Sequence, residues 1–359
     1  MNTIRVDLGP RSYDIAIVSN EAGLLGEFAG VRCSGRLAVV VADSNTSIHA
    51  TAVADRLQEV SFSTEMVCVR AGEASKCLAE AAGLYDRLAG LNADRRTLIV
   101  AVGGGMVGDL AGFVAATWNR GLPLLMVPTS LLGMVDSSVG GKVGINHAKG
   151  KNLIGAFHQP VGVWIDTRYL DTLPEREYLS GLAEVVKYGV IVDAELFAWL
   201  EANADALRAR NPAAVRHVVA RSCRLKADVV ERDEFELTGE RAALNFGHTF
   251  AHAFETAGGY GAWLHGEAVA AGMACACRLA ERLSLIPSEL TARVTTLLER
   301  FQLPTAAGPW PAEGLIAVMR RDKKAQAGRL RFILPKRIGE VAAFDDVAEN
   351  LVSESLKSK

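Results

Sequence analysis

Residues 97–109 read TLIVAVGGGMVGD, and this stretch decides the fold class. A short run of aliphatic and β-branched residues leads into three glycines, and residues 110–117 then follow a helical pattern. A buried strand that ends in a turn before a helix is typical of α/β proteins with a parallel sheet. Glycines let backbone N–H groups approach a pyrophosphate closely, and the helix N-terminus favours its charge. The stretch therefore predicts a nucleotide-binding turn, with a tight turn that binds no ligand as the alternative.

The glycines fit the pattern G-x-G-x-x-G at Gly103, Gly105 and Gly108. In a dinucleotide-binding unit an acid is expected about 20 residues later to hold the ribose hydroxyls, yet residues 123–130 contain none. Asp43 ends an earlier β-branched run and is the better candidate for the ribose.

Strand and helix patterns alternate around this stretch in the first half of the chain. The expected strands are 4–8 and 13–18 as a hairpin, then 36–43, 64–69, 97–102 and 122–127, with helices at 48–60 and 75–89. From about residue 174 the pattern is helical, at 176–192, 213–231, 242–257, 266–283 and 289–300, with strands only at 330–334 and 339–343. We predict an α/β protein in which residues 1–172 form a domain with a mostly parallel sheet and residues 173–359 form a mainly α-helical domain.

Composition excludes several classes of function. Of the 359 residues, 50% are hydrophobic and 22% charged, and the net charge is −2, so a basic surface for nucleic acid is not expected. The six cysteines are scattered without a C-x-x-C, which is typical of reduced thiols in a cytosolic protein. Neither a secretory signal nor a membrane-spanning run is evident in the sequence, so we expect a cytoplasmic protein without membrane partners.

The middle of the chain is basic and rich in glycine. Residues 128–155 contain six glycines, Asp136 and the lysines Lys142, Lys149 and Lys151. This glycine content disfavours a regular helix or strand, so we expect an ordered loop. Lysines and accessible N–H groups suit a phosphorylated ligand; the alternative is a surface loop with solvated lysines.

Three of the seven histidines, His248, His252 and His265, fall within 18 residues. In a helix His248 and His252 share a face, one turn apart. Glu184 and Lys187 lie three residues apart in an otherwise apolar stretch, where charged groups should be paired or functional. Two histidines and one carboxylate are typical of a catalytic zinc site that leaves a coordination position open. The alternative is a set of hydrogen-bonded core histidines. Candidate anion contacts nearby in the sequence are Arg224, Lys226, Arg241 and the run 322–324.

A series of motifs between Gly72 and Gly339 resembles the 3-dehydroquinate synthase family, a branch of the sugar-phosphate cyclases. The motifs are GE-x-x-K (72–76), GGG-x-x-GD-x-x-GF (103–113), NRG (119–121), DSSVGGK (136–142), GKN-x-IGAF (150–157), DT-x-x-L-x-TLP (166–174), GLAEVVKYG (181–189), LNFGHTFAHAFE (244–255) and LHGEAVA-x-GM (264–273). Their order and spacing match the family, and together they are highly specific. One departure is that the segment from Asp233 to Arg241 is one residue longer than the usual D-E-x-E-x-G-x-R. Met134 stands where the family commonly has a polar residue.

The resemblance implies that Glu184, His248 and His265 bind a divalent metal, usually zinc and sometimes cobalt. It implies that the α/β domain (1–172) binds the nucleotide and the helical domain (173–359) binds the metal, with the active site between them. It also implies homodimers. The residues implied to line NAD are Asp43, Gly72, Glu73, Lys76, Gly104, Gly105, Asp109, Thr129, Ser130, Lys142, Lys151, Tyr169 and Thr172. Those implied to surround the substrate are Asp136, Lys142, Asn152, Lys187, Lys226, Arg241, Asn245, His252 and Lys324, with Arg120 near phosphate.

The implied reaction converts 3-deoxy-D-arabino-heptulosonate 7-phosphate into 3-dehydroquinate and phosphate, a lyase reaction of the shikimate pathway. It proceeds through transient oxidation by NAD, β-elimination of phosphate, re-reduction and an intramolecular aldol closure. Three alternatives remain. Another cyclase could make amino-dehydroquinate or a cyclitol, although Arg241 favours a substrate with a carboxylate. An alcohol dehydrogenase would use the same metal and NAD, although the basic residues 142–152 disfavour it. A metabolite-binding protein could keep the fold without catalysis.

Overall fold

The glycine-containing stretch forms a strand and a helix in the computed structural model, which describes residues 1–259, 261–321, 330–345 and 347–357. Strand β5 (Leu98–Gly103) is buried along its whole length and leads through Gly104 into helix α4 (Gly105–Thr117). β5 belongs to a seven-stranded sheet of order β1-β2-β9-β6-β5-β3-β4, in which only β1 and β2 pair antiparallel. The predicted α/β fold with a mostly parallel sheet is therefore confirmed.

Clustering of contacts divides the chain into two units. The first unit holds Met1–Pro174 and Ser222–Phe235, and the second holds Glu175–Arg221 and Glu236–Lys359. The remaining strands of the first unit are β1 (Asn2–Val6), β2 (Tyr13–Val18), β3 (Leu37–Asp43), β4 (Ser63–Val69), β6 (Leu124–Pro128), β7 (Lys142–His147), β8 (Gly150–Phe157) and β9 (Gly162–Asp166). Its other helices are α1 (Leu25–Gly30), α2 (Ser47–Glu59) and α3 (Leu78–Gly90).

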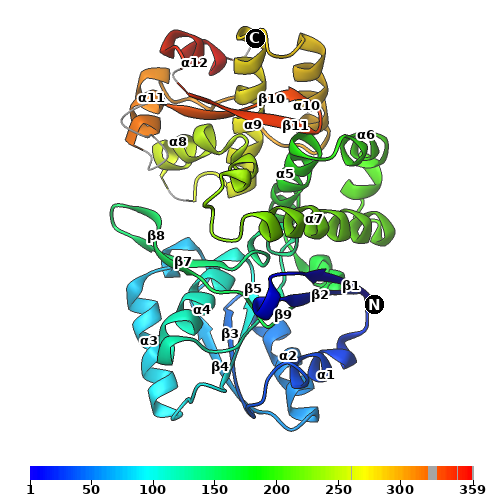
Figure 1. Ribbon diagram of the computed structural model, residues 1–359, viewed down its shortest axis with the longest axis vertical. Helices are drawn as coiled ribbons and strands as arrows, with labels where there is room; N and C mark the ends of the chain where they lie inside the picture. The colour runs from blue at the N-terminus through cyan, green and yellow to red at the C-terminus, as the bar shows by residue number, and fades with distance from the viewer. Residues whose placement is uncertain (260, 322–329, 346, 358–359) are drawn as a thin grey trace. The chain divides into compact units, whose positions relative to one another are not determined.

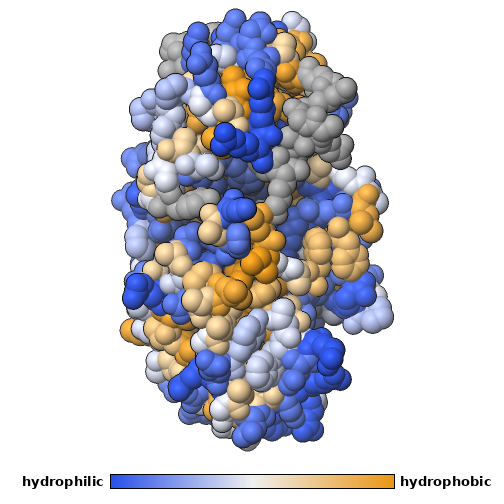
Figure 2. Space-filling model, turned by 90° about the vertical axis from the view of Figure 1, so that its left-hand side faces the viewer, coloured by the Kyte–Doolittle hydropathy of each residue, from blue (hydrophilic) through white to orange (hydrophobic). Residues whose placement is uncertain are grey.

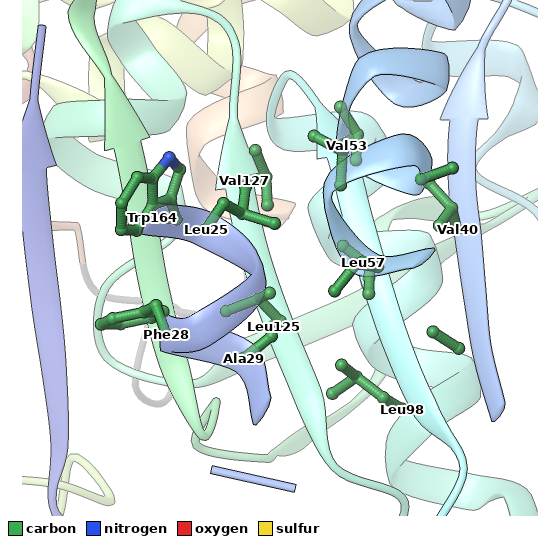
Figure 3. Close-up of a cluster of buried hydrophobic side chains, with 14 of the residues drawn as sticks. Leu25, Phe28, Ala29, Val40, Val53, Leu57, Leu98, Leu125, Val127 and Trp164 are labelled. Carbon is green, nitrogen blue, oxygen red and sulfur yellow. The ribbon is translucent and has the colours of Figure 1, made fainter. Parts of the chain in front are cut away.

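Helices cover both faces of the large sheet, α1 and α2 on one and α3 and α4 on the other (Figure 1). Under α1 and α2 lies a core in which Phe28 and Leu57 pack toward Trp164 of β9 and the aliphatic residues of β3, β5 and β6 (Figure 3). Full burial of a large apolar side chain stabilises a fold by roughly 1.5–3 kcal/mol. These strands are apolar on both faces because both faces are covered.

The sequence reasoning missed β9. This strand, GVWID, lies between β2 and β6 in the sheet, pairing Val163 with both Ile15 and Met126. Its partners are far away in the sequence, so local periodicity gives little sign of its place in the sheet.

The expectation of a loop throughout residues 128–155 is wrong, because Gly133–Ser137 forms a one-turn π-helix and the second part forms two strands. β7 and β8 form an antiparallel hairpin in which Gly144 faces Gly155. A Cβ on Gly144 would lie 2.7 Å from the Ile154 carbonyl oxygen, and one on Gly155 would lie 2.5 Å from that of Val143. The glycines therefore permit a close approach of the two strands, a role that glycine content alone does not distinguish from a loop.

The second unit is mainly helical, as predicted. Its helices are α5 (Glu175–Ile191), α6 (Ala194–Arg208), the first part of α7 (Pro212–Arg232), α8 (His248–Gly258), α9 (His265–Arg282), α10 (Ser288–Arg300), α11 (Ala312–Arg321) and α12 (Glu349–Ser355), with a hairpin of β10 (Arg331–Arg337) and β11 (Glu340–Asp345). The single helix expected at 242–257 is interrupted. The 3-10 helix η7 (Glu240–Asn245) is followed by Gly247 at φ 79°, and α8 begins only at His248. This left-handed conformation suits glycine and cannot continue a helix.

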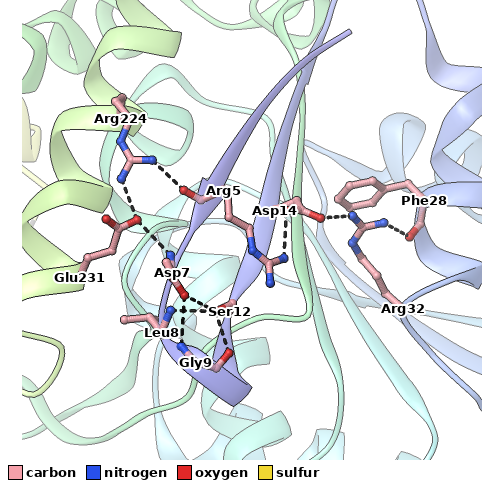
Figure 4. A network of polar contacts seen from close by, with 10 residues as sticks. All are labelled: Arg5, Asp7, Leu8, Gly9, Ser12, Asp14, Phe28, Arg32, Arg224 and Glu231. Carbon is pink, nitrogen blue, oxygen red and sulfur yellow. Dashed lines mark hydrogen bonds and ion pairs between the residues drawn. The ribbon is translucent and has the colours of Figure 1, made fainter.

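Helix α7 is shared between the units, whereas the prediction placed every residue after 172 in the second domain. The Arg224 guanidinium donates to the Arg5 carbonyl oxygen (2.7 Å) and to Glu231 (2.7 Å), and the Glu231 carboxylate accepts from the Asp7 backbone N–H (3.0 Å; Figure 4). These contacts, made with β1 and the residue after it, attach Ser222–Phe235 to the first unit.

The surface mixes polar and apolar residues, and Figure 2 shows hydrophobic patches interspersed with hydrophilic side chains on one face. Such patches are normal on folded proteins. Among the described residues, no helix combines the length and apolarity needed to cross a bilayer.

Candidate functional site

Close contacts at glycines assemble a metal-type site in the second unit. Gly266 follows His265, and a Cβ on it would lie 1.8 Å from the carbonyl oxygen of Ser180, one turn before Glu184 on α5. Gly247 precedes His248, and a Cβ there would lie 2.8 Å from the Met273 amide nitrogen on α9. Each histidine is thus adjacent to a glycine that lets its helix approach a neighbour.

The three predicted ligands come together. One ligand atom from each of Glu184, His248 and His265 lies within 4.8 Å of the other two. The Nε2 atoms of His248 and His265 are 3.9 Å and 3.7 Å from Glu184 Oε1. The sequence left open whether these were core histidines, and the geometry favours a shared ligand.

Each histidine is oriented through its other ring nitrogen. His248 Nδ1 is 3.1 Å from the Phe246 carbonyl oxygen, and His265 Nδ1 is 3.4 Å from Glu255 Oε1. An acceptor at Nδ1 favours a proton there and leaves Nε2 as the ligand atom. Sequence reasoning missed Glu255, which is buried. Its position seven residues after His248, on the same helical face, was the available signal.

The residues fit a divalent cation. Glu184 is fully buried, and among the described residues neither carboxylate oxygen has a hydrogen-bond partner. The Lys187 ammonium forms an ion pair with Oε2 and neutralises one charge. A buried carboxylate without hydrogen bonds is costly. A cation held by Glu184 and two imidazole Nε2 atoms would offset that cost, and this donor set is typical of catalytic zinc.

Other predicted residues lie in the same unit. Lys187 and Arg241 are each 1% exposed, and Arg241 Nε lies 3.9 Å from Glu236 Oε1. Arg241 and Asn245 both belong to η7. His252 is outside the ligand set, with its ring centroid 5.7 Å from that of His248. Whether these four groups contact a substrate stays a prediction.

In the first unit the glycine turn lies where the strand order reverses. The chain adds β4 on one side of β3 and then returns to place β5 on the other side. Asp43 and Gly103 therefore end neighbouring parallel strands at the same edge, and Thr46 Oγ1 donates to the Val102 carbonyl oxygen across them (3.0 Å). Ligands of α/β proteins bind in the crevice at such a switch point. Asp43 Oδ1 also accepts from the Asn45 backbone N–H (2.9 Å) before α2.

A charge cluster around the buried Lys76 ammonium lies in the same unit. The Lys76 ammonium, 4% exposed, forms an ion pair with Asp109 on α4 and lies 3.9 Å from Glu73 Oε1. Burial raises the pKa of the Asp109 carboxyl, and the Lys76 ammonium opposes that rise. Asn146 of β7 joins the cluster by donating to Glu73 (2.8 Å). The sequence reasoning overlooked Asn146.

Close packing surrounds the glycine turn. The Thr129 backbone N–H donates to the Gly103 carbonyl oxygen (2.9 Å). A Cβ on Gly104 would lie 3.3 Å from Ser130 Oγ, and one on Gly105 would lie 3.1 Å from Ser137 Oγ. A side chain at Gly104 or Gly105 would therefore require the neighbouring serine hydroxyl to move by a few tenths of an ångström.

Two further groups of predicted residues meet within the first unit. The Lys226 ammonium donates to the backbone and side chain of Asp136, at 2.5 and 2.7 Å. Thr172 Oγ1 is 2.9 Å from His49 Nε2, and the His49 and Tyr169 rings are 4.6 Å apart. Burial raises the pKa of the Tyr169 hydroxyl to about 12.

The remaining predicted residues are more scattered. Gly72, Lys142 and Asn152 are exposed and Lys151 is half-buried, the last three on the β7–β8 hairpin. Arg120 is exposed on a 3-10 turn (Trp118–Arg120), and no hydrogen bond or ion pair joins it to another predicted site residue that the structure describes. Lys324 lies outside the described residues.

A parallel sheet with a glycine turn at its switch point, together with a Glu–His–His set between helices, defines a class of nucleotide- and metal-dependent α/β proteins. Two protein-family models match most of the chain. The model of the 3-dehydroquinate synthase N-terminal domain matches residues 66–180, and that of the C-terminal domain matches residues 181–325. A relative named 3-dehydroquinate synthase from Desulforamulus reducens is 46% identical over 354 residues, 97% of this chain and 98% of its own. The chain belongs to the 3-dehydroquinate synthase family.

Solved structures of sugar-phosphate cyclases share the fold of this chain. A 2-deoxy-scyllo-inosose synthase complexed with carbaglucose-6-phosphate, NAD+ and Co2+ has a TM-score of 0.89 at 26% identity and covers 99% of both chains. A 2-epi-5-epi-valiolone synthase from Streptomyces hygroscopicus with NAD+ and Zn2+ has a TM-score of 0.88 at 26% identity, covering 96% of this chain and 95% of its own. The ligands in both structures are those predicted for this chain, NAD and a divalent metal.

Proposed function

We propose that this chain is a lyase that converts 3-deoxy-D-arabino-heptulosonate 7-phosphate into 3-dehydroquinate and phosphate. The observation that carries the proposal is the Glu184–His248–His265 set, found in a chain that matches relatives named 3-dehydroquinate synthase along its whole length. The reaction breaks the bond between carbon and the phosphate ester oxygen and leaves no net oxidation.

The residues of the second unit supply the contacts to the reacting carbons. When bound by Glu184, His248 and His265, a divalent metal supplies Lewis acidity to a substrate hydroxyl, and NAD supplies a reversible hydride acceptor. Lys187 pairs with Glu184 and stabilises negative charge that develops beside the ligand set. Arg241, buried and always cationic, binds the substrate carboxylate through its planar fork.

The residues of the first unit bind the nucleotide. Asp43 takes the ribose hydroxyls, and the N–H groups that follow Gly103 take the pyrophosphate. The Glu73–Lys76–Asp109 cluster places one ammonium and two carboxylates near the bound nucleotide. Lys226 holds Asp136 in one orientation for substrate.

An assay separates this proposal from its competitors. Protein supplied with zinc, substoichiometric NAD and the heptulosonate phosphate should release many phosphates per NAD without accumulating NADH. Steady NADH formation would indicate an alcohol dehydrogenase instead. Turnover of sedoheptulose 7-phosphate, glucose 6-phosphate or the amino analogue in preference to the heptulosonate would indicate another cyclase. NAD binding without turnover of any of them would indicate a binding protein.

The assembly and location are part of the same proposal. We propose a cytoplasmic homodimer in which Arg120, exposed on its turn, contacts phosphate. Light scattering of the purified protein tests the dimer. Mixing the inactive variants Arg120→Ala and His248→Ala tests whether the arginine acts across subunits: recovery of activity in the mixed dimers supports it, and no recovery contradicts it.

A further inference from the structure

Asn146 interrupts the β7–β8 hairpin and turns toward the charge cluster of the first unit. The register shifts between Ile145 and His147, so that Asn146 alone faces residues 151–153 of β8. Such a bulge bends a strand and redirects its side chains, and bulges are frequent beside functional sites. Asn152, in the bulged segment, has a left-handed φ of 52°.

Three polar groups of Asn146 form hydrogen bonds within the first unit. Its Nδ2 donates to Glu73 Oε1 (2.8 Å), and its backbone N–H donates to the Lys76 carbonyl oxygen (2.8 Å). Its Oδ1 accepts from the backbone N–H of Asn152 (2.9 Å). One amide side chain thus connects the bulge of the hairpin to the residues that hold the Lys76 ammonium.

We propose that Asn146 is a positioning residue that couples the β7–β8 hairpin, which carries Lys142, Lys151 and Asn152, to the Glu73–Lys76–Asp109 cluster. The bond to Glu73 fixes that carboxylate beside Lys76. The bond from Asn152 fixes the hairpin in a left-handed turn, which asparagine adopts more readily than other residues with a Cβ. Asn146 therefore sets the affinity for NAD without touching the reacting atoms. The inference rests on the proposed function only in assigning this cluster to the nucleotide.

The side-chain chemistry offers a reciprocal test. Asn146→Ala removes both side-chain bonds. Asn146→Asp keeps an acceptor for Asn152 but places two carboxylates against each other. The double variant Asn146→Asp with Glu73→Gln restores a bond of reversed polarity, because the glutamine amide donates to the new carboxylate. The charge of the pair is the same as in the unsubstituted protein.

Equilibrium binding of NAD to the full-length protein gives the first measurement. We expect both single Asn146 variants to weaken NAD binding by roughly tenfold or more, as for loss of a hydrogen bond to a charged group. The double variant should recover most of this loss, and Glu73→Gln alone completes the cycle. The control is His147→Ala, an exposed neighbour on the same hairpin that should bind NAD normally.

Hydrogen exchange gives a second measurement that is independent of turnover. The Asn152 amide should exchange faster in Asn146→Ala than in His147→Ala, whereas amides of β5 should not change. Kinetically, KM for NAD should rise more than kcat falls.

Unchanged NAD affinity in the Asn146 variants, or no recovery in the double variant, would overturn the inference even in a protein that releases phosphate normally. Absent phosphate release with the expected NAD pattern would instead contradict only the proposed reaction. An unsubstituted protein that binds no NAD would overturn both.

Discussion

At the scale of single residues, Glu184 links the stability of the candidate metal site to its chemistry. Its carboxylate is fully buried and pairs with the Lys187 ammonium, so removal of Lys187 leaves an uncompensated charge in a low-dielectric environment. Glu184 lies on α5 with buried neighbours along most of the helix, which restricts its orientation. The functional chemistry and the stability of this part of the second unit are therefore linked.

Replacing a ligand should remove metal and activity together. We expect Glu184→Ala or His248→Ala to lose bound zinc on dialysis and to lose phosphate release, because the two remaining protein ligands are too few to hold the cation. Metal analysis and the phosphate assay measure the two effects. His217→Ala, which alters a histidine whose ring centroid lies 4.3 Å from that of Trp199, is the control and should retain both metal and activity. A metal-free variant with full activity would refute the site.

The buried acid behind His265 should tune metal affinity. Glu255→Gln keeps the shape of the side chain but removes the charge that favours the His265 ligand tautomer. We expect zinc to bind about 10–100-fold more weakly, measured by competition with a chromophoric chelator. Equal zinc affinity in the variant and the unsubstituted protein would show that the 3.4 Å contact has no such role.

His158 should make the fold sensitive to mild acid. Burial lowers the pKa of its imidazole, while its Nε2 donates to the Leu122 carbonyl oxygen (2.8 Å). The unfolded chain then binds more protons than the folded one between the lowered pKa and the ordinary value of about 6.5. The free energy of unfolding should be fully retained above that ordinary value and fall as pH drops through the window to the lowered pKa.

Urea unfolding across this pH range measures the effect. His158→Gln keeps a donor for Leu122 without a titrating group, so its unfolding free energy should fall less steeply between neutral and mildly acidic pH. Parallel pH profiles for the two proteins would exclude His158 as the cause. Comparing the two proteins cancels the contribution of the other histidines.

Element scale: glycines decide how closely the helices approach. Gly266 allows α9 to pack against the backbone of α5. A Cβ added to Gly272 would lie 2.2 Å from the Gly247 carbonyl oxygen. Interiors are packed densely enough that one added methyl group must displace backbone at such contacts. The spacing of the ligand-bearing helices is therefore a property of these contacts.

Gly266→Ala should separate α5 from α9. The added Cβ would overlap the Ser180 carbonyl oxygen, so we expect destabilisation of at least about 1–3 kcal/mol together with weaker zinc binding. Denaturant unfolding and zinc titration check both effects. The matched control is Gly83→Ala on α3, where no atom lies within 4 Å and alanine should stabilise the helix by roughly 0.5–1 kcal/mol. Tight zinc binding in Gly266→Ala would contradict this account of the site.

Whole-molecule scale: the metal-type ligands all belong to the second unit, whereas the glycine turn and its charge cluster belong to the first. A ligand that binds only the folded state stabilises the unit that contains its site, by about 2.7 kcal/mol at a free concentration 100 times Kd. The two ligands should therefore stabilise different parts of the chain.

Chelation should show this division. We expect removal of zinc to lower Tm and to increase hydrogen exchange in α5, α8 and α9 more than in β3 and β5. Exchange measured with and without chelator tests it, and His248→Ala, which should not respond to the chelator, is the control. Equal loss of protection in both units would contradict the expectation.

Much of the fold was predictable because its signals are local. Apolar runs between helical patterns identified β3 to β6 and their helices, and the glycine turn identified the strand–helix junction at Gly103. The motifs also predicted Glu184, His248 and His265 as metal ligands, and these residues lie together in the second unit. The predicted boundary after residue 172 does not describe α7, which contributes residues to both units. A boundary at a single chain position cannot express that a later segment returns to the first unit.

The sequence by itself determined the alternation of strands and helices, the family and the ligand candidates, because these depend on periodicity and on residue types at fixed spacing. Only the tertiary structure decided that β9 lies between β2 and β6, and that Gly144 and Gly155 make a hairpin rather than a loop. It also decided that Glu255 supports His265 and that Asn146 reaches Glu73. Each of these depends on which backbone comes within a few ångströms of which side chain, and such approaches join residues that no local pattern relates.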